Sequence, residues 1–197
     1  MRSVAFCLVA AAAALALGAV TLVRPPAAPA EAGTEQQPAA ARADRTLAAA
    51  VAARQIRTID RYRKQTWSYQ RLMRRPLSPT SHSARRSSNP TYRQWVVNLW
   101  RKRAAAAKRQ AHNPPRLGAW MCIHRHEARW DDPNGPYYGG LQMDLHFQRL
   151  YGADLLRRKG TADRWTPIEQ IWVAERAYRS GRGFFPWPRT ARSCGLI

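Results

Sequence analysis

Residues 122–142 read CIHRHEARWDDPNGPYYGGLQ, and their one glutamate, Glu127, lies between aromatic side chains and a turn-rich loop. Trp120 and His124 lie at helical spacing, and Glu127 follows on the edge of the same stripe. Asp131-Asp-Pro133 then stops the helix, so we expect Glu127 in its last turn. There the helix dipole and the neighbouring tryptophans favour a protonated carboxyl group, which is what a general acid needs. The neighbouring histidines and arginines would favour the ionised form if their side chains faced the carboxyl group, and the sequence leaves this open.

The sequence after Glu127 predicts a series of short elements. Residues 134–143 indicate a turn followed by a short hairpin or extended loop. Asp144 is expected to cap a helix that Gly152 interrupts. The run Thr166-Pro-Ile-Glu169 has the pattern of a capping box, and the helix that it starts is predicted to end at Ser180-Gly181.

The N-terminal segment has a positive start and a long uncharged stretch. Arg2 precedes residues 4–23, which carry no charge, and an Ala/Pro-rich run follows. This is the pattern of an export signal, but the stretch is also long enough to span a bilayer. Residues 1–32 are therefore either a cleaved signal peptide or a retained membrane anchor. Both alternatives place the rest of the chain outside the cytoplasm, secreted or anchored in the cell envelope.

Glycine is concentrated in the C-terminal part of the chain. Nine of the 11 glycines fall between Gly118 and Gly195. A compact domain that reverses direction repeatedly needs such residues, so residues 116–197 are predicted to form the globular domain. A domain this small is near the lower limit for independent folding, and an exported chain favours a covalent link. We therefore predict a disulfide between Cys122 and Cys194.

The region before this domain carries most of the positive charge. Of the 33 lysines and arginines in this chain of net charge +21, 18 lie in residues 33–115, with three of the 12 acidic residues. An Ala/Arg-rich spacer is predicted, with helices at about 43–75 and 92–111. The sequence leaves open whether this spacer is helical or disordered, and whether it packs on the domain. Its expected partners, through residues 43–111, are anionic wall polymers or lipid headgroups, and nucleic acid is not expected.

The globular domain carries a set of motifs in a consistent order along residues 117–197. They are a helix with Glu127, the segment Tyr137-Tyr-Gly-Gly-Leu-Gln142, a helix with Ala174-Glu-Arg176, and a terminal Pro-Trp-Pro followed by a cysteine. This arrangement resembles the catalytic domain of resuscitation-promoting factors, lysozyme-like and lytic-transglycosylase-related proteins of bacterial cell walls. The resemblance implies a small α-rich (α+β), lysozyme-like fold. The chain departs from the family pattern in the four residues that separate Cys122 from Glu127.

The same resemblance implies an activity and a set of site residues. The implied activity is cleavage of the β-1,4 bonds of peptidoglycan glycan strands, with Glu127 as the catalytic acid. The expected substrate contacts are Trp130, Tyr138, Gly140, Gln142 and Trp187. The residues alone leave two alternatives open. Gln142 could hydrogen-bond its own loop instead of a sugar, and Trp187 could fill the core instead of contacting substrate.

A partner carboxylate for Glu127 is not evident. Asp131 and Asp132 lie in a turn and Asp144 looks like a helix cap, so a mechanism with one glutamate is predicted. The substrate's own N-acetyl group or a positioned water would supply the remaining chemistry. Glu175 is expected in a buried ion pair rather than as a second catalytic carboxylate.

A zinc site is the natural competing interpretation of Cys122, His124, His126 and Glu127. The helical zinc-protease motif needs a histidine three positions after its glutamate, and Trp130 occupies that position. The cysteine also has a use in the disulfide. We therefore predict no metal and no other cofactor.

The sequence thus predicts an exported enzyme that cleaves peptidoglycan, either by hydrolysis or by anhydro-forming transglycosylation. The main alternative is a non-catalytic cell-wall-binding protein that its basic spacer retains. A third hypothesis is a basic protein that disrupts membranes through residues 43–111.

Overall fold

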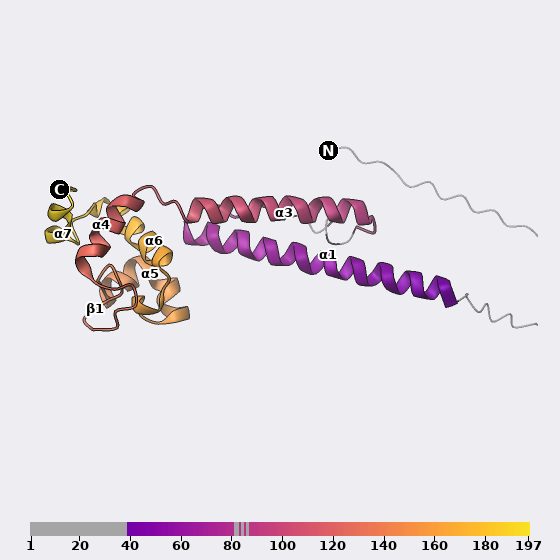
Figure 1. Ribbon diagram of the computed structural model, residues 1–197, viewed down its shortest axis with the longest axis horizontal. Coiled ribbons are helices and arrows are strands. Elements are labelled where there is room, and N and C mark those ends of the chain that lie inside the picture. Colours follow the sequence, from indigo (N-terminus) through magenta and orange to yellow (C-terminus); the bar gives the residue numbers. More distant parts are fainter. Residues whose placement is uncertain (1–38, 81–82, 84, 86) are drawn as a thin grey trace, which may run out of the picture. The chain divides into compact units, whose positions relative to one another are not determined.

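The computed structural model describes residues 39–80, 83, 85 and 87–197 (Figure 1). The export segment predicted for residues 1–32 lies outside this range. The elements in chain order are α1 (Ala39–Leu72), α3 (Pro90–Ala111), α4 (Leu117–Glu127), β1 (Tyr137–Tyr138), β2 (Met143–Asp144), α5 (Leu145–Lys159), the 3-10 helix η1 (Ala162–Arg164), α6 (Pro167–Ala177), the π-helix η2 (Tyr178–Arg182) and α7 (Pro188–Ser193). Helices dominate and both strands are short, which confirms the α-rich prediction. Across the described residues, no helix combines the length and apolar character that a membrane span requires.

Helices α1 and α3 lie side by side and run in the same direction, as a parallel helical pair (Figure 1). Gln55 within α1 donates a hydrogen bond to the carbonyl oxygen of Pro90 at the start of α3, and Arg75 just after α1 donates to Gln110 near the end of α3. Asn89 caps α3 by accepting a hydrogen bond from the backbone N–H of Tyr92 at 3.0 Å. Between the two helices, Ile59 of α1 is buried with Val96 and Trp100 of α3. The basic spacer is therefore helical over α1 and α3, and it has an apolar core of its own.

The C-terminal ends of this helical pair contact the C-terminal domain. Trp172 of α6 donates from its indole Nε1 to the carbonyl oxygen of Ala111 at 2.7 Å, and Arg176 donates to the carbonyl oxygen of Leu72 at 2.9 Å. Both acceptors lie at helix C-termini, where carbonyl groups lack partners within the helix. Met73 is buried in the same place, against Ala111 and Trp172. The helical pair thus packs on the domain, a point that the sequence had left open.

The loop after α4 leads into the predicted β-hairpin and a kinked helix. β1 and β2 pair as antiparallel strands. Asp144 then caps α5 by accepting a hydrogen bond from the backbone N–H of Phe147 at 2.6 Å. The helix is interrupted at Gly152, as predicted, where a Cβ atom would lie 2.6 Å from the ring of Trp165.

Helix α6 forms the centre of the domain core. It starts with the predicted capping box, in which Thr166 and Glu169 each accept a hydrogen bond from the backbone N–H of the other. All its residues from Gln170 to Ala177 are buried. Large side chains from α4, α5 and the C-terminal segment surround it: Trp120, Ile123, Leu155, Phe184 and Trp187. The helix of Glu127 and the C-terminal tail are therefore held by one core.

Glu175 of α6 is the fully buried acid of this core. It is 0% exposed, and its Oε1 accepts a hydrogen bond from the indole Nε1 of Trp120 at 2.8 Å. Its Oε2 lies 3.3 Å from Arg116 and 3.5 Å from Arg179. Glu175 is thus a buried ion-pair residue, and its partners are these two arginines rather than the adjacent Arg176.

Glu175→Ala is expected to lower the free energy of unfolding by about 3–5 kcal/mol, because it leaves the Trp120 indole N–H and the Arg116 guanidinium without their acceptor. Urea unfolding followed by tryptophan fluorescence measures the change. The matched control is Asp131→Ala, which removes an exposed acid and should leave the unfolding midpoint unchanged. Equal midpoints for the two variants would contradict a structural role for the buried carboxylate.

Candidate functional site

Glu127 is the last residue of α4, as predicted. The helix ends there because Ala128 has an extended backbone conformation, with φ −158° and ψ 178°. Trp120 and Ile123 of the same helix are 0% exposed and anchor it in the core. Because Glu127 lies one turn after Ile123, its half-buried side chain emerges at the edge of the buried face.

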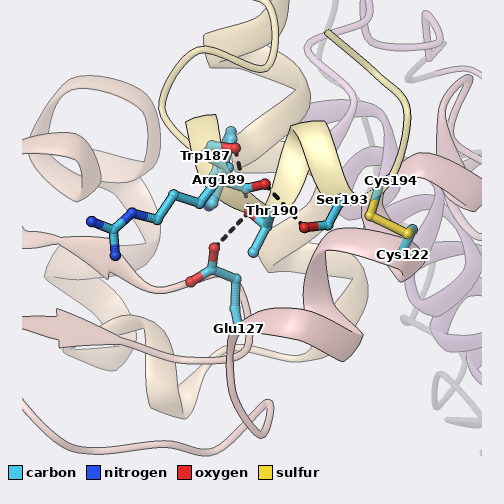
Figure 2. The surroundings of a disulfide bond; sticks show 7 residues. All are labelled: Cys122, Glu127, Trp187, Arg189, Thr190, Ser193 and Cys194. Carbon is cyan, nitrogen blue, oxygen red and sulfur yellow. Dashed lines mark hydrogen bonds between the residues drawn. A yellow bond between two sulfur atoms is a disulfide. The ribbon is translucent and has the colours of Figure 1, made fainter.

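The carboxyl group of Glu127 is held by a residue that sequence reasoning missed. Thr190 of α7 donates a hydrogen bond from Oγ1 to Glu127 Oε1 at 2.7 Å, and Figure 2 shows the two side chains facing each other. The same hydroxyl lies 3.3 Å from the carbonyl oxygen of Trp187, which is a second acceptor. Glu127 Oε2 has no hydrogen-bond partner among the described residues. One oxygen is thus fixed, and the other is free for a ligand.

A disulfide holds α7 against α4. Cys122 and Cys194 are bonded, as predicted, with their Cα atoms 6.1 Å apart (Figure 2). On α4 the cysteine lies five positions before Glu127, and at the end of α7 it lies four positions after Thr190. The predicted disulfide was therefore the signal in the sequence that could have pointed to Thr190.

An open groove borders Glu127. It has a volume of 480 Å³ and is lined by residues 124–131. A second cavity of 540 Å³, lined by residues between Arg129 and Asn134, shares Arg129 and Asp131 with it. The two cavities therefore lie on either side of the same part of the loop that follows α4.

Trp130 lines this groove and is fixed by its neighbours. Its ring stacks on His124, with centroids 3.9 Å apart and an interplanar angle of 20°. Gly140 packs directly against both rings, because a Cβ atom there would lie 2.7 Å from His124 Nδ1 and from the Trp130 ring. The predicted site residue Gly140 is buried, and its role in the structure is to let the loop approach this stacked pair.

Gln142 and Tyr138 are half-buried and belong to the loop packing. Gln142 donates from Nε2 to Asp132 Oδ2 at 2.9 Å and to the carbonyl oxygen of Gly139 at 3.0 Å. Its backbone has φ 48°, a conformation that few residues other than glycine adopt. Tyr138 packs against the domain core, with its hydroxyl group next to Gly135. Of the two uses left open for Gln142, the structure shows the hydrogen bonds within its own loop.

Trp187 is a core residue. It is 4% exposed, and its Nε1 donates to the carbonyl oxygen of Leu141 at 2.7 Å. Its ring packs on Trp120 at a centroid distance of 5.1 Å. This corrects the expectation of a substrate contact, because the hydrophobic side chain is used inside the domain. The exposed aromatic residue of this segment is Phe185, at 73%.

Each of the three aspartates near Glu127 in sequence has another role. Asp131 forms an exposed ion pair with Arg129, whose hydrogen bonds lower the pKa of this carboxyl group below its ordinary value. Asp132 accepts hydrogen bonds from Asn134 and from the loop glutamine. Asp144 caps α5. Of the two acids that line the groove, Asp131 has both oxygens bonded to Arg129, whereas Glu127 keeps one oxygen without a hydrogen-bond partner among the described residues.

Within the described residues, one group of side chains approaches the geometry of a metal site. The ligand atoms of Cys122, His126 and Cys194 lie within 4.8 Å of one another. Both sulfur atoms belong to the disulfide, so neither is a thiolate, and thiolate is the form that binds metals. His126 is the remaining donor of this group.

No family model matches the chain, and no curated protein or solved structure matches it either. The function must therefore be argued from the geometry of Glu127 and its groove.

Proposed function

We propose that this chain is an exported peptidoglycan-cleaving enzyme that uses Glu127 as its general acid and base. The observation that carries the proposal is the position of one half-buried carboxyl group at an open groove. Thr190 holds Glu127 Oε1, while Oε2 is left for the scissile glycosidic oxygen. A groove that is open to solvent gives a polymer access to the carboxyl group, and a carboxyl group of fixed orientation suits proton transfer.

The fold around Glu127 supports a lysozyme-like domain of the type found in resuscitation-promoting factors. A short β-hairpin follows the helix of Glu127. The buried helix α6 packs in the same core as the helix of Glu127. The disulfide joins the Glu127 helix to the C-terminal tail, at the cysteine pair that the resemblance implies.

The chemistry needs one carboxyl group of the protein. Glu127 protonates the glycosidic oxygen as the bond from that oxygen to the anomeric carbon breaks, and the N-acetyl carbonyl oxygen of the same sugar or a water attacks that carbon. Where the N-acetyl oxygen attacked first, a water or the sugar's own 6-hydroxyl group then attacks the same carbon and the bond from that carbon to the N-acetyl oxygen breaks. In either route the Glu127 carboxylate accepts the proton of the attacking water or hydroxyl group. A water gives hydrolysis, and the sugar's own 6-hydroxyl group gives the 1,6-anhydro product. No second carboxylate is required.

Thr190 suits both protonation states of this acid. Its hydroxyl group donates to Glu127 Oε1 when the carboxyl group is ionised. When Glu127 carries the proton, the hydroxyl group can turn toward the carbonyl oxygen of Trp187 and leave the carboxyl group free to donate. A threonine at this place therefore keeps the acid oriented through the cycle without fixing its charge.

The groove also offers contacts for the substrate. Trp130 provides an aromatic surface for a sugar ring, and Arg125 and Arg129 provide positive charge. Peptidoglycan carries carboxylate groups on its lactyl ethers and stem peptides, so this charge is complementary to the polymer.

The test is digestion of purified peptidoglycan by the full-length protein, followed by turbidity and by mass spectrometry of the soluble products. We expect soluble muropeptides, whose ends distinguish hydrolysis from anhydro formation by the presence or absence of one water. Sedimentation of the protein with peptidoglycan but without any released product would overturn the enzyme proposal and would favour the wall-binding alternative.

A further inference from the structure

Two adjoining cavities lie where the C-terminal ends of the helical pair α1 and α3 meet α6, and their lining is rich in arginine. They have volumes of 360 Å³ and 350 Å³ and share Arg74, Trp172 and Arg179 among their walls. Five arginines line them in total: Arg74, Arg75, Arg109, Arg176 and Arg179. In the part of the chain that the structure describes, no aspartate or glutamate lines either cavity.

Carboxylates outside the lining balance only part of this charge. Asp154 lies 3.4 Å from Arg176, and Glu175 lies 3.5 Å from Arg179. Each of these acids also pairs with a further arginine that lines neither cavity. Counting described residues alone, three arginines of the lining have no carboxylate within ion-pair distance: Arg74, Arg75 and Arg109.

Arg176 is the buried member of the cluster. It is 8% exposed and donates to the carbonyl oxygens of Tyr151 and Leu72, but its Nε has no acceptor among the described residues. Burial lowers the pKa of its guanidinium group; Asp154 opposes this shift, and the nearby Arg74 adds to it. A buried cation with an unpaired donor and a like charge beside it is unfavourable, and an anion in the cavity would relieve both effects.

Arg74 occupies a backbone position that glycine usually takes. At the C-terminal end of α1, the backbone N–H of Arg75 bonds to the carbonyl oxygen of Gln70, which is the hydrogen bond of a Schellman motif. Arg74 itself has φ 51°, the left-handed conformation that side chains with a Cβ atom disfavour. An arginine here is conformationally unfavourable compared with glycine. Its presence therefore indicates that its charged side chain has a use at the cavity.

We propose that these five arginines bind a phosphate group between the helical pair and the domain. Guanidinium groups form paired, charge-assisted hydrogen bonds to phosphate oxygens, and a cluster of them matches the multiple charges of that group. The cavities are at the small end of the about 300–1,000 Å³ range of ligand sites. This size fits a small phosphorylated molecule or one segment of a phosphodiester polymer. The site shares no lining residue with the groove of Glu127, so it stands independently of the proposed enzyme activity.

Isothermal titration of the full-length protein at constant ionic strength tests the proposal, with inorganic phosphate, pyrophosphate and long-chain polyphosphate as probes. Arg74→Gly and Arg109→Ala are each expected to weaken binding about tenfold, the loss of roughly one charge-assisted hydrogen bond. Arg74→Gly should also keep the melting temperature of the protein or raise it, since glycine adopts the left-handed conformation freely. The matched control is Arg101→Ala, which removes an exposed cation of α3 that lines neither cavity.

The pattern across probes and variants decides the outcome. Binding of phosphate or pyrophosphate that the two cavity variants weaken and Arg101→Ala does not would establish a small-molecule site. The same pattern with polyphosphate alone would identify a polymer as the source of the phosphate group. The proposal is overturned if none of the three probes binds at millimolar concentration, or if Arg101→Ala weakens binding as much as Arg109→Ala does, because charge without a site would then explain the result.

Discussion

Glu127→Gln is expected to reduce the release of soluble muropeptides from peptidoglycan about 100- to 10,000-fold, the usual contribution of a general acid. The amide has nearly the shape of the carboxyl group and can still accept the hydrogen bond from Thr190, but it has no acidic proton to give. The fold and the groove should therefore be preserved while the chemistry is lost. Mass spectrometry of timed digests measures the effect, and sedimentation with peptidoglycan should show unchanged binding.

A neighbouring acid of the same groove provides the control for this variant. Asp131→Asn removes a carboxylate that lines the groove but is paired with Arg129. It should retain most of the activity. Equal rates for wild type and Glu127→Gln would remove Glu127 from the mechanism. A similar loss in both variants would instead indicate that the groove depends on overall charge rather than on one acid.

The parts of this fold that the sequence predicted are those specified by residues close together in the chain. The capping box of Thr166 and Glu169, the cap at Asp144 and the break at Gly152 each depend on contacts within a few residues or on backbone freedom. The disulfide joins distant residues, but its prediction needed only the count of cysteines and the export signal expected from the sequence.

What the sequence did not predict depends on contacts between distant residues. The burial of Trp187 and the assignment of Arg116 as a partner of Glu175 both follow from the packing of α4 and the tail around α6. A tryptophan between two prolines has the same local sequence whether it faces the core or a ligand. The candidate site was therefore predicted at Glu127, whereas Thr190, which orients it, became visible only through the tertiary structure.

The paired Cys122→Ser and Cys194→Ser variant is expected to lose about 4 kcal/mol of unfolding free energy, from the chain-entropy model for this loop. The disulfide joins residues 72 positions apart and so restricts almost the whole domain in its unfolded state. Urea unfolding of wild type and the double variant, without reductant, measures this difference. Wild type in the presence of dithiothreitol should approach the double variant, and dithiothreitol should have no further effect on the double variant.

The same variant tests how the candidate site is held together. Helix α7 has six residues, too few to be stable without packing, and Thr190 reaches Glu127 from it. If the disulfide keeps α7 in place, the double variant should lose peptidoglycan-cleaving activity even at a temperature where circular dichroism shows it folded. Full activity per folded molecule would show instead that the buried Ala191 and Trp187 are enough to position α7. A stability loss below about 1 kcal/mol would contradict the chain-entropy argument itself and would imply that the unfolded chain already keeps its two ends together.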